Sequence, residues 1–202
     1  MTEEELLIDR EEYLKRGVHI GTKAQHTDME DYIFHVKKNQ LAVINLTKTD
    51  QQIREAGEFL ADFEPETVLF VGRKPEAKEP IQKVSEALGT DFITGRFMPG
   101  SLTNPQSENF TEPDVIVTID PEVDAQAIDE AADTNVPVVS LADSENRLDN
   151  IDVVIPANNK GEKAIGTVLF LLGKEIAEHR GLDFDYELED FAEVEDVEED
   201  EE

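Results

Sequence analysis

Short apolar segments alternate with longer amphipathic segments through most of this chain, and this alternation restricts the possible folds more than any other feature. Strands that alternate with helices of ten or more residues form βαβ units, so the sequence predicts an α/β protein with a mainly parallel sheet. Near-continuous Val, Ile and Leu in the strands indicates that both sheet faces are covered. The predicted strands are 67–72, 91–94, 115–119, 136–141 and 153–155. The predicted helices are 49–63, 77–88, a segment that ends at 132, and 161–179.

The first part of the chain has a different pattern. A helix is predicted over 9–17, with Glu12 placed as in a capping box and a glycine placed to end the helix. Residues 18–23 are rich in turn-forming residues. Two further strands, 32–37 and 41–46, are separated by three polar residues, so we expect an antiparallel β-hairpin.

Acidic residues strongly outnumber basic ones. The chain has 48 Asp and Glu against 18 Lys and Arg, a formal charge of −30. Residues 183–202 hold 13 of these acids and no Lys or Arg, so we expect a disordered acidic tail there. Without those 13 acids, residues 1–182 still carry −17, so the acidity is spread over the chain. Distributed acidity is typical of a protein that works in concentrated salt, where a Debye length of roughly 3 Å at 1 M screens the repulsion.

Several kinds of site are absent from the sequence. The chain has no cysteine, which excludes disulfides and thiol nucleophiles, and its four histidines form no metal-binding motif. Residues 72–75 follow a strand but lack the glycine-rich nucleotide fingerprint, and no segment matches a P-loop. The acidic N-terminus and the lack of long apolar runs argue against a signal peptide and a membrane span. We therefore expect no catalytic residue, no metal and no cofactor.

Small polar residues gather in the loops that follow the predicted strands. In a parallel sheet these loops meet at one edge, where ligands bind. The segment 95–105 is the most informative, because it combines an arginine, two glycines and two prolines with Ser, Thr and Asn. Such side chains hydrogen-bond phosphate and sugar groups. The other loops at this edge are 72–75, 120–121, 142–146 and 156–161.

Taken together in order, these segments resemble the S-two family of small-subunit ribosomal proteins, whose eukaryotic members are the laminin-receptor-type SA proteins. The resemblance runs from about residue 9 to residue 180. The short connection from Pro105 to Pro113 lacks the helical hairpin of bacterial members, and the amino-acid sequence of 97–100 is similar to that of archaeal members. With the acidity, this favours a haloarchaeal source. The segments that carry the resemblance are 17–22, 32–34, 69–74, 95–105, 112–121, 136–139 and 155–161.

The resemblance implies a flavodoxin-like three-layer α/β/α fold with an N-terminal helix and hairpin. It implies a non-catalytic structural constituent of the small ribosomal subunit that supports translation in the cytoplasm. It also implies contacts with ribosomal RNA and neighbouring ribosomal proteins near the junction of head and body, and no membrane or small-molecule substrate. The expected parts are 1–31, with the N-terminal helix and RNA-docking loop, the α/β domain 32–182, and the tail 183–202.

The RNA contacts are expected from three kinds of residue. Glycines allow close approach of the backbone, Lys and Arg pair with phosphates, and Asn and Thr supply hydrogen bonds. His19, in a loop flanked by glycines, either contacts RNA or stacks on a base, or it packs under the loop and helps to order it. The predicted RNA-binding residues are Gly17, His19, Gly21, Thr22, Lys23, Lys37, Lys38, Arg73, Lys74, Arg96, Thr103, Asn104, Asn158, Asn159 and Lys160.

Two other functions remain open from the sequence. An enzyme acting on sugar phosphates or nucleotides could use the same fold, since fold does not determine function. Such an enzyme would bind a small ligand stoichiometrically. A surface receptor is a weaker alternative, suggested only by the eukaryotic relatives.

Overall fold

A five-stranded parallel sheet forms the centre of the protein. The computed structural model describes residues 6–192, so the predicted features at 1–5 and 193–202 lie outside the described residues. The strand order is β4-β3-β5-β6-β7, which becomes 2-1-3-4-5 when these strands alone are counted along the chain. This is the flavodoxin-like order, and it confirms the predicted fold class. The strands are β3 (Val68–Gly72), β4 (Asp91–Thr94), β5 (Val115–Thr118), β6 (Val138–Ala142) and β7 (Val153–Pro156).

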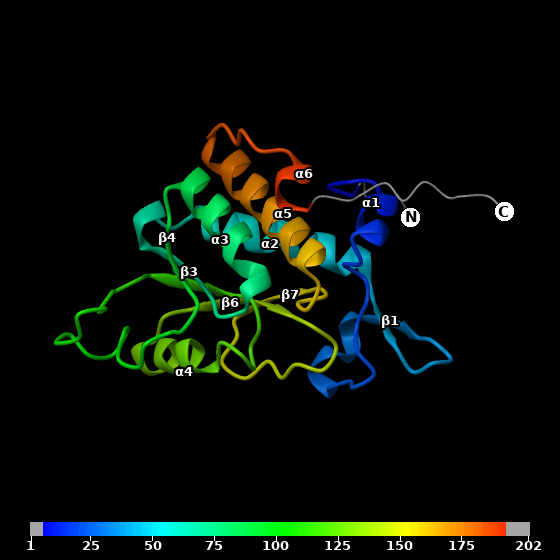
Figure 1. Ribbon diagram of the computed structural model, residues 1–202, viewed down its shortest axis with the longest axis horizontal. Helices are drawn as coiled ribbons and strands as arrows, with labels where there is room; N and C mark the ends of the chain where they lie inside the picture. Colours follow the sequence, from blue (N-terminus) through cyan, green and yellow to red (C-terminus); the bar gives the residue numbers. More distant parts are fainter. Residues whose placement is uncertain (1–5, 193–202) are drawn as a thin grey trace.

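Helices cover the two faces of the sheet unequally (Figure 1). Three long helices pack on one face, where they form the larger part of the hydrophobic core. The other face has one helix and the long irregular segment 95–114, which contains no helical hairpin. The helices of the first face are α2 (Leu46–Ala61), α3 (Pro75–Leu88) and α5 (Glu162–Arg180), and that of the second is α4 (Ala125–Thr134). A short 3-10 helix, η2 (Pro65–Thr67), precedes β3.

The side chains of each strand alternate between these two cores. In β3, Phe70 packs under the three helices, whereas Leu69 and Val71 pack under α4. Because the side chains on both faces of β3 are apolar, its sequence is a continuous hydrophobic run. At the end of β3, a Cβ on Gly72 would collide with Ile81 of α3. The glycine therefore lets α3 begin directly over the carboxyl edge of the sheet.

The N-terminal part adds a small antiparallel sheet beside the main one. The elements of the N-terminal part are α1 (Arg10–Lys15), η1 (Thr27–Tyr32), β1 (Ile33–Val36) and β2 (Ala42–Ile44), and β1 and β2 form the sheet. The hairpin of β1 and β2 is confirmed and projects from the body of the protein (Figure 1).

Two local predictions in this part were wrong. The second hairpin strand stops at Ile44, because the Asn45 side chain accepts a hydrogen bond from Thr47 N at 3.1 Å and caps α2. The capping box of α1 is absent, because Glu12 pairs with Arg16 and Lys15 instead of the backbone. Ion pairs within the helix thus replace the predicted backbone cap.

The prediction of disorder from residue 183 onward is also wrong for 183–192. In this segment Phe184, Tyr186 and Phe191 form an aromatic cluster with Phe170 of α5, and Leu188–Phe191 form the short helix α6. Burial of these rings outweighs the charge repulsion on which the prediction rested. The rest of the predicted tail lies outside the described residues, and the three-part division of the chain stays a prediction.

Candidate nucleic-acid interface

The segment before η1 runs antiparallel to β2 and forms an isolated β-bridge between Ile20 and Val43. The Gly21 N–H donates to Ala42 O at 3.0 Å, and the Ala42 N–H donates to Thr22 O at 2.9 Å. A Cβ on Gly21 would lie 3.0 Å from both Ala42 O and Ser144 Oγ, so a larger residue here would crowd these two atoms. Gly17 has φ +70° and ends α1. Both glycines therefore serve close contacts or turns within the protein.

His19 lies beside the end of β2, where its carbonyl accepts a hydrogen bond from the Ile44 N–H at 2.9 Å. Burial lowers the pKa of the half-buried His19, and the positive charge of Lys37 lowers this pKa further. The Nδ1 atom of His19 is buried and has no hydrogen-bond partner among the described residues. The imidazole is therefore held neutral near pH 7, next to an exposed cation.

Lys23, Lys37 and Lys38 are exposed, and none of them forms an ion pair with any residue in 6–192. The surface that carries them, residues 17–27 and 32–45, is called the basic hairpin below. It contains no Asp or Glu, although the average composition of the chain would place about six there. The basic hairpin is thus positively charged itself, and the exposed acids Asp28, Glu30 and Asp31 of η1 lie between its two segments.

The carboxyl edge of the main sheet carries two more exposed cations, Arg73 and Arg96. Neither is ion-paired within the part of the chain that the structure describes. Arg73 follows β3 and Arg96 follows β4, so the parallel pairing of these strands brings both to one edge. The structure thus places them where the sequence predicted.

Glu130 of α4 holds the loop that follows Arg96, which the sequence did not predict. Its carboxylate accepts hydrogen bonds from the backbone N–H of Gly100 and Leu102 and from the Thr103 hydroxyl. Burial favours a raised pKa, but the donated N–H bonds outweigh it, so the pKa of Glu130 is lowered. The nearby Asn104 is exposed and accepts from Gln106 N at 3.1 Å.

Lys74 does not extend into solvent. Its Nζ lies 2.6 Å from Asp120 Oδ2, and its side chain is 14% exposed. It also donates to the backbone carbonyl of the fully buried Asn159, whose amide donates to Asn146 Oδ1 at 2.9 Å. These partners could not be found in the sequence, because 46 and 85 residues separate Lys74 from Asp120 and Asn159. Lys74 and Asn159 therefore join four loops of the sheet edge to one another.

Asn158 joins the sheet edge to the N-terminal part. Its amide donates to Gly17 O at 3.0 Å, and its Oδ1 accepts from the backbone N–H of Lys160. The exposed Lys160 side chain pairs with Glu145. Thr22 is tied in similarly, because its N–H donates to Ser144 Oγ at 2.9 Å. The basic hairpin is thereby fixed to the carboxyl edge of the main sheet.

Two buried aspartates complete this polar edge. Asp124 accepts hydrogen bonds from the backbone N–H of Arg73, Ile119 and Asp120, yet burial still raises its pKa. Burial also raises the pKa of Asp143, whose Oδ2 has no partner among the described residues. Both carboxylates order loop backbone, as Glu130 does.

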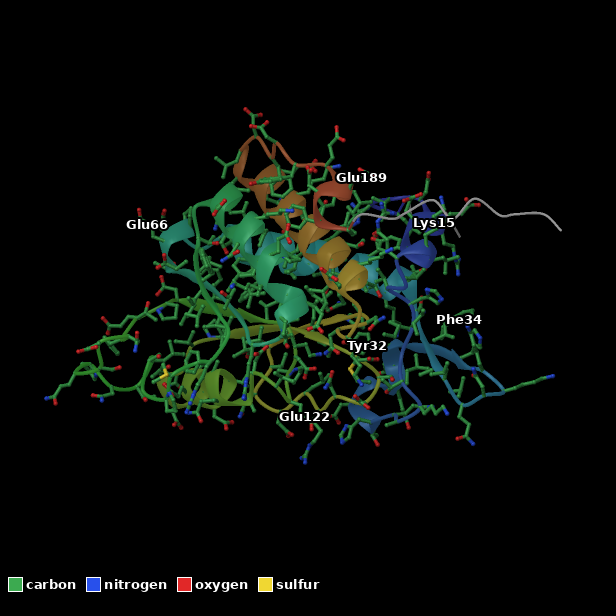
Figure 2. All side chains as sticks on the ribbon, viewed as in Figure 1. Lys15, Tyr32, Phe34, Glu66, Glu122 and Glu189 are labelled. Carbon is green, nitrogen blue, oxygen red and sulfur yellow. The ribbon has the colours of Figure 1, made fainter. Side chains whose placement is uncertain are left out.

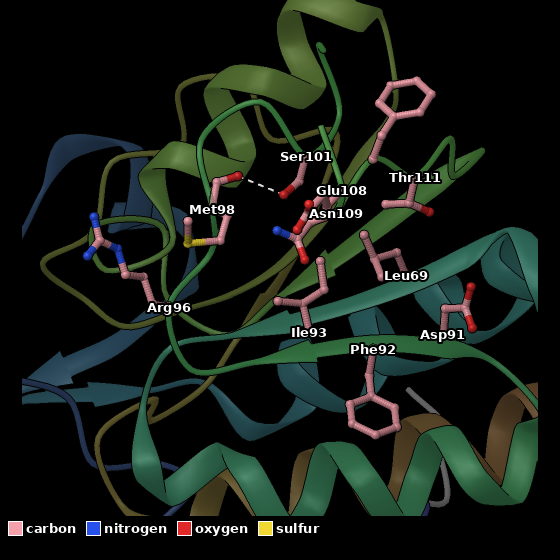
Figure 3. Close-up of a pocket in the computed structure, with 11 residues that line it drawn as sticks. Leu69, Asp91, Phe92, Ile93, Arg96, Met98, Ser101, Glu108, Asn109 and Thr111 are labelled. Atoms are coloured by element: carbon pink, nitrogen blue, oxygen red, sulfur yellow. Dashed lines mark hydrogen bonds between the residues drawn. The ribbon is translucent and has the colours of Figure 1, made fainter. Parts of the chain in front are cut away.

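A pocket of about 320 Å³ lies between β4 and the 95–111 segment (Figure 3). Leu69 and Ile93 contribute apolar surface, and Met98 and Arg96 lie on the loop side. The Ser101 hydroxyl donates to Met98 O at 2.7 Å, so this hydroxyl is used within the loop.

No group of three His, Asp or Glu suited to a metal ion occurs within residues 6–192. None of the helices described there is long and apolar enough to cross a bilayer.

Comparison with known proteins gives the class of this protein. The family model described as "Ribosomal protein S2" matches residues 13–112 and 107–179. The chain is 43% identical over 189 residues to "Small ribosomal subunit protein uS2" of Haloquadratum walsbyi, covering 94% of this chain and 68% of that relative. These matches define a structural component of the small ribosomal subunit, which acts in translation and is not an enzyme. The chain belongs to the ribosomal protein S2 family and is of the haloarchaeal type.

Proposed function

We propose that the basic hairpin, together with Arg73 and Arg96, binds the ribosomal RNA of the small subunit. The observation that carries this proposal is the complete absence of acids from the basic hairpin in a chain of charge −30. Exposed cations without protein partners are the groups that pair with RNA phosphates. We further propose that the bound protein lies near the junction of head and body and contacts neighbouring ribosomal proteins there.

Concentrated salt limits how these cations act. At about 1 M salt the Debye length is roughly 3 Å, so charges interact mainly when they are in contact. Lys23, Lys37 and Lys38 therefore bind phosphates at short range, and the net charge of −30 has little effect beyond it. Phosphate and sugar contacts outnumber base contacts in this mode, and the shape of the folded RNA sets where they form.

The other predicted residues take part in two ways. The buried and half-buried residues position the loops, so they act on RNA affinity through the geometry of the exposed cations. The exposed residues add hydrogen bonds to sugar or phosphate. The first group is Gly17, His19, Gly21, Thr22, Lys74, Asn158 and Asn159, and the second is Thr103, Asn104 and Lys160.

Binding of deproteinised small-subunit ribosomal RNA from a haloarchaeon tests the proposal. We expect Lys37→Gln and Lys38→Gln each to weaken binding several-fold. Each should also reduce the slope of log K against log salt concentration by roughly 0.7–0.9, the effect of one lost phosphate contact. Lys174→Gln is the matched control, since Lys174 is exposed on α5, outside the basic hairpin, and has no ion pair within residues 6–192.

Equal effects of the control and the hairpin variants would contradict the proposed interface. A density map of the assembled subunit tests the location. It should show the basic hairpin against RNA near the junction of head and body, and a position elsewhere would contradict the proposed location.

A further inference from the structure

Phe34 is the most exposed large apolar side chain among the described residues, at 63% of its full accessible area. Figure 2 shows it projecting from the hairpin. Exposing an aromatic ring to water is unfavourable, and it has no structural benefit within this chain. The exposed ring is therefore free to contact a partner outside the protein.

The hairpin orients this ring with an irregularity in β1. Ile33 pairs with Ile44 and His35 pairs with Val43, so Phe34 is an extra residue with no partner on β2. Such bulges redirect a side chain and interrupt the regular ladder of the strand. The His35 ring packs edge-on against Phe34, with 5.3 Å between ring centroids. The ring thus has a defined position and an open face.

The surroundings of Phe34 fit a nucleic acid better than a protein strand. The bulge makes β1 a poor template for adding another strand, because it breaks the hydrogen-bond spacing. Lys37 and Lys38 follow on the same hairpin, and no Asp or Glu lies in 32–45. Proteins that bind single-stranded nucleic acids usually combine cations that contact the backbone with an aromatic ring that stacks on a base.

We propose that Phe34 stacks on an unpaired base of the ribosomal RNA while Lys37 and Lys38 bind the flanking phosphates. The base must be unpaired, because bases inside a helix already have both faces stacked and are out of reach of a protein ring. This inference rests on the proposed function and adds the kind of RNA structure that the hairpin selects.

Fluorescence tests this directly, because the chain has no tryptophan. Phe34→Trp places a single reporter at an exposed position, where the larger ring has room. We expect deproteinised haloarchaeal small-subunit RNA to quench its emission, as stacking on a base does. Leu182→Trp, two residues beyond the end of α5 that lies far from the hairpin in Figure 1, should show no quenching. Phe34→Leu keeps an apolar side chain without a ring and should weaken binding about tenfold, the loss of stacking on one base.

The outcomes separate this inference from the proposed function. RNA binding that depends on Lys37 and Lys38 but leaves the Phe34→Trp emission unchanged overturns the stacking and leaves the RNA interface intact. A blue shift that appears only in the assembled subunit means that a protein covers the ring, and it overturns the stacking too. Equal quenching by a fully paired RNA duplex contradicts the selection of unpaired bases. Failure of the unaltered protein to bind the RNA overturns both proposals.

Discussion

Glu130 on α4 accepts a hydrogen bond from the backbone N–H of Gly100, with 2.7 Å between the nitrogen and the carboxylate oxygen. Gly100 has φ +90°, a backbone conformation that other residues rarely adopt, so the turn needs both the glycine and the acceptor. Through this contact, a helix on one face of the sheet determines the course of the loop that follows Arg96.

Glu130→Ala should therefore destabilise the protein by about 2 kcal/mol or more, because buried N–H groups lose a charged acceptor. The pKa of Glu130 is lowered in the folded protein, so its contribution is present above the ordinary value of 4.5 and decreases as the pH falls through the lowered pKa. Urea unfolding of the wild type and the variant at several pH values should show a difference that shrinks with acidity. A difference independent of pH would contradict the role of the carboxylate.

Lys74→Met should destabilise the protein by about 3–5 kcal/mol, because it leaves the buried Asp120 carboxylate without its partner. The double variant Lys74→Met/Asp120→Leu should recover much of this loss, since it removes both charges. Urea unfolding measures both values. The control Lys78→Met changes an exposed lysine that lacks an ion pair in the described part of the chain, and it should cost less than about 0.5 kcal/mol. If Lys74→Met proved as mild as the control, the ion pair would have no structural weight.

Lys37→Gln should raise the pKa of His19, because it removes a nearby positive charge. The pKa should remain below the ordinary value of 6.5, since burial is the larger cause of its lowering. An NMR titration of the imidazole measures the change. His179→Gln is a control that should leave the His19 pKa unchanged, because the charges acting on His19 come from the hairpin. An unchanged pKa in Lys37→Gln would show that the two side chains are farther apart than the structure has them.

Salt should stabilise the folded protein strongly. A formal charge of −30 destabilises the compact state through repulsion, and this repulsion is screened as the Debye length falls from about 10 Å at 0.1 M to about 3 Å at 1 M. The melting temperature should rise steadily with potassium chloride over that range. Sucrose at matched water activity should raise it much less, and an equal rise would mean that water activity, not charge screening, is responsible.

The order of the elements followed from the sequence because each depends on neighbouring residues. The apolar runs of β3 and β5 are local patterns, and so is the helical pattern of α5. The partners of Lys74 and Glu130 depend on contacts between distant loops, which periodicity does not record. The error at 183–192 has the same origin. Its acidic charge can be seen in the segment itself, whereas the packing of its aromatic rings on α5 depends on residues far away in the sequence.

The sequence predicted where these residues lie in the fold better than which groups their side chains contact. Arg73 and Arg96 lie exposed at the carboxyl edge, as parallel strands require. Asn159, by contrast, was predicted to bind RNA because its side chain is polar. In the structure this side chain is buried, and its amide donates to Asn146 Oδ1 instead. An Asn in a loop is equally suited to bind a ligand or to hold the backbone, and only its surroundings decide between the two.

The buried Arg16 of the first helix donates to the backbone carbonyl of Ala192, which lies 176 residues further along the chain. During translation the donor is made 176 residues before the acceptor. Until Ala192 has been made, therefore, this guanidinium lacks one of its folded-state acceptors, and α5 lacks its full aromatic cover. A chain that ended before α6 would therefore contain the sheet and its helices, but the aromatic face of α5 would lack the cover of Phe191 and Arg16 would lack this backbone acceptor.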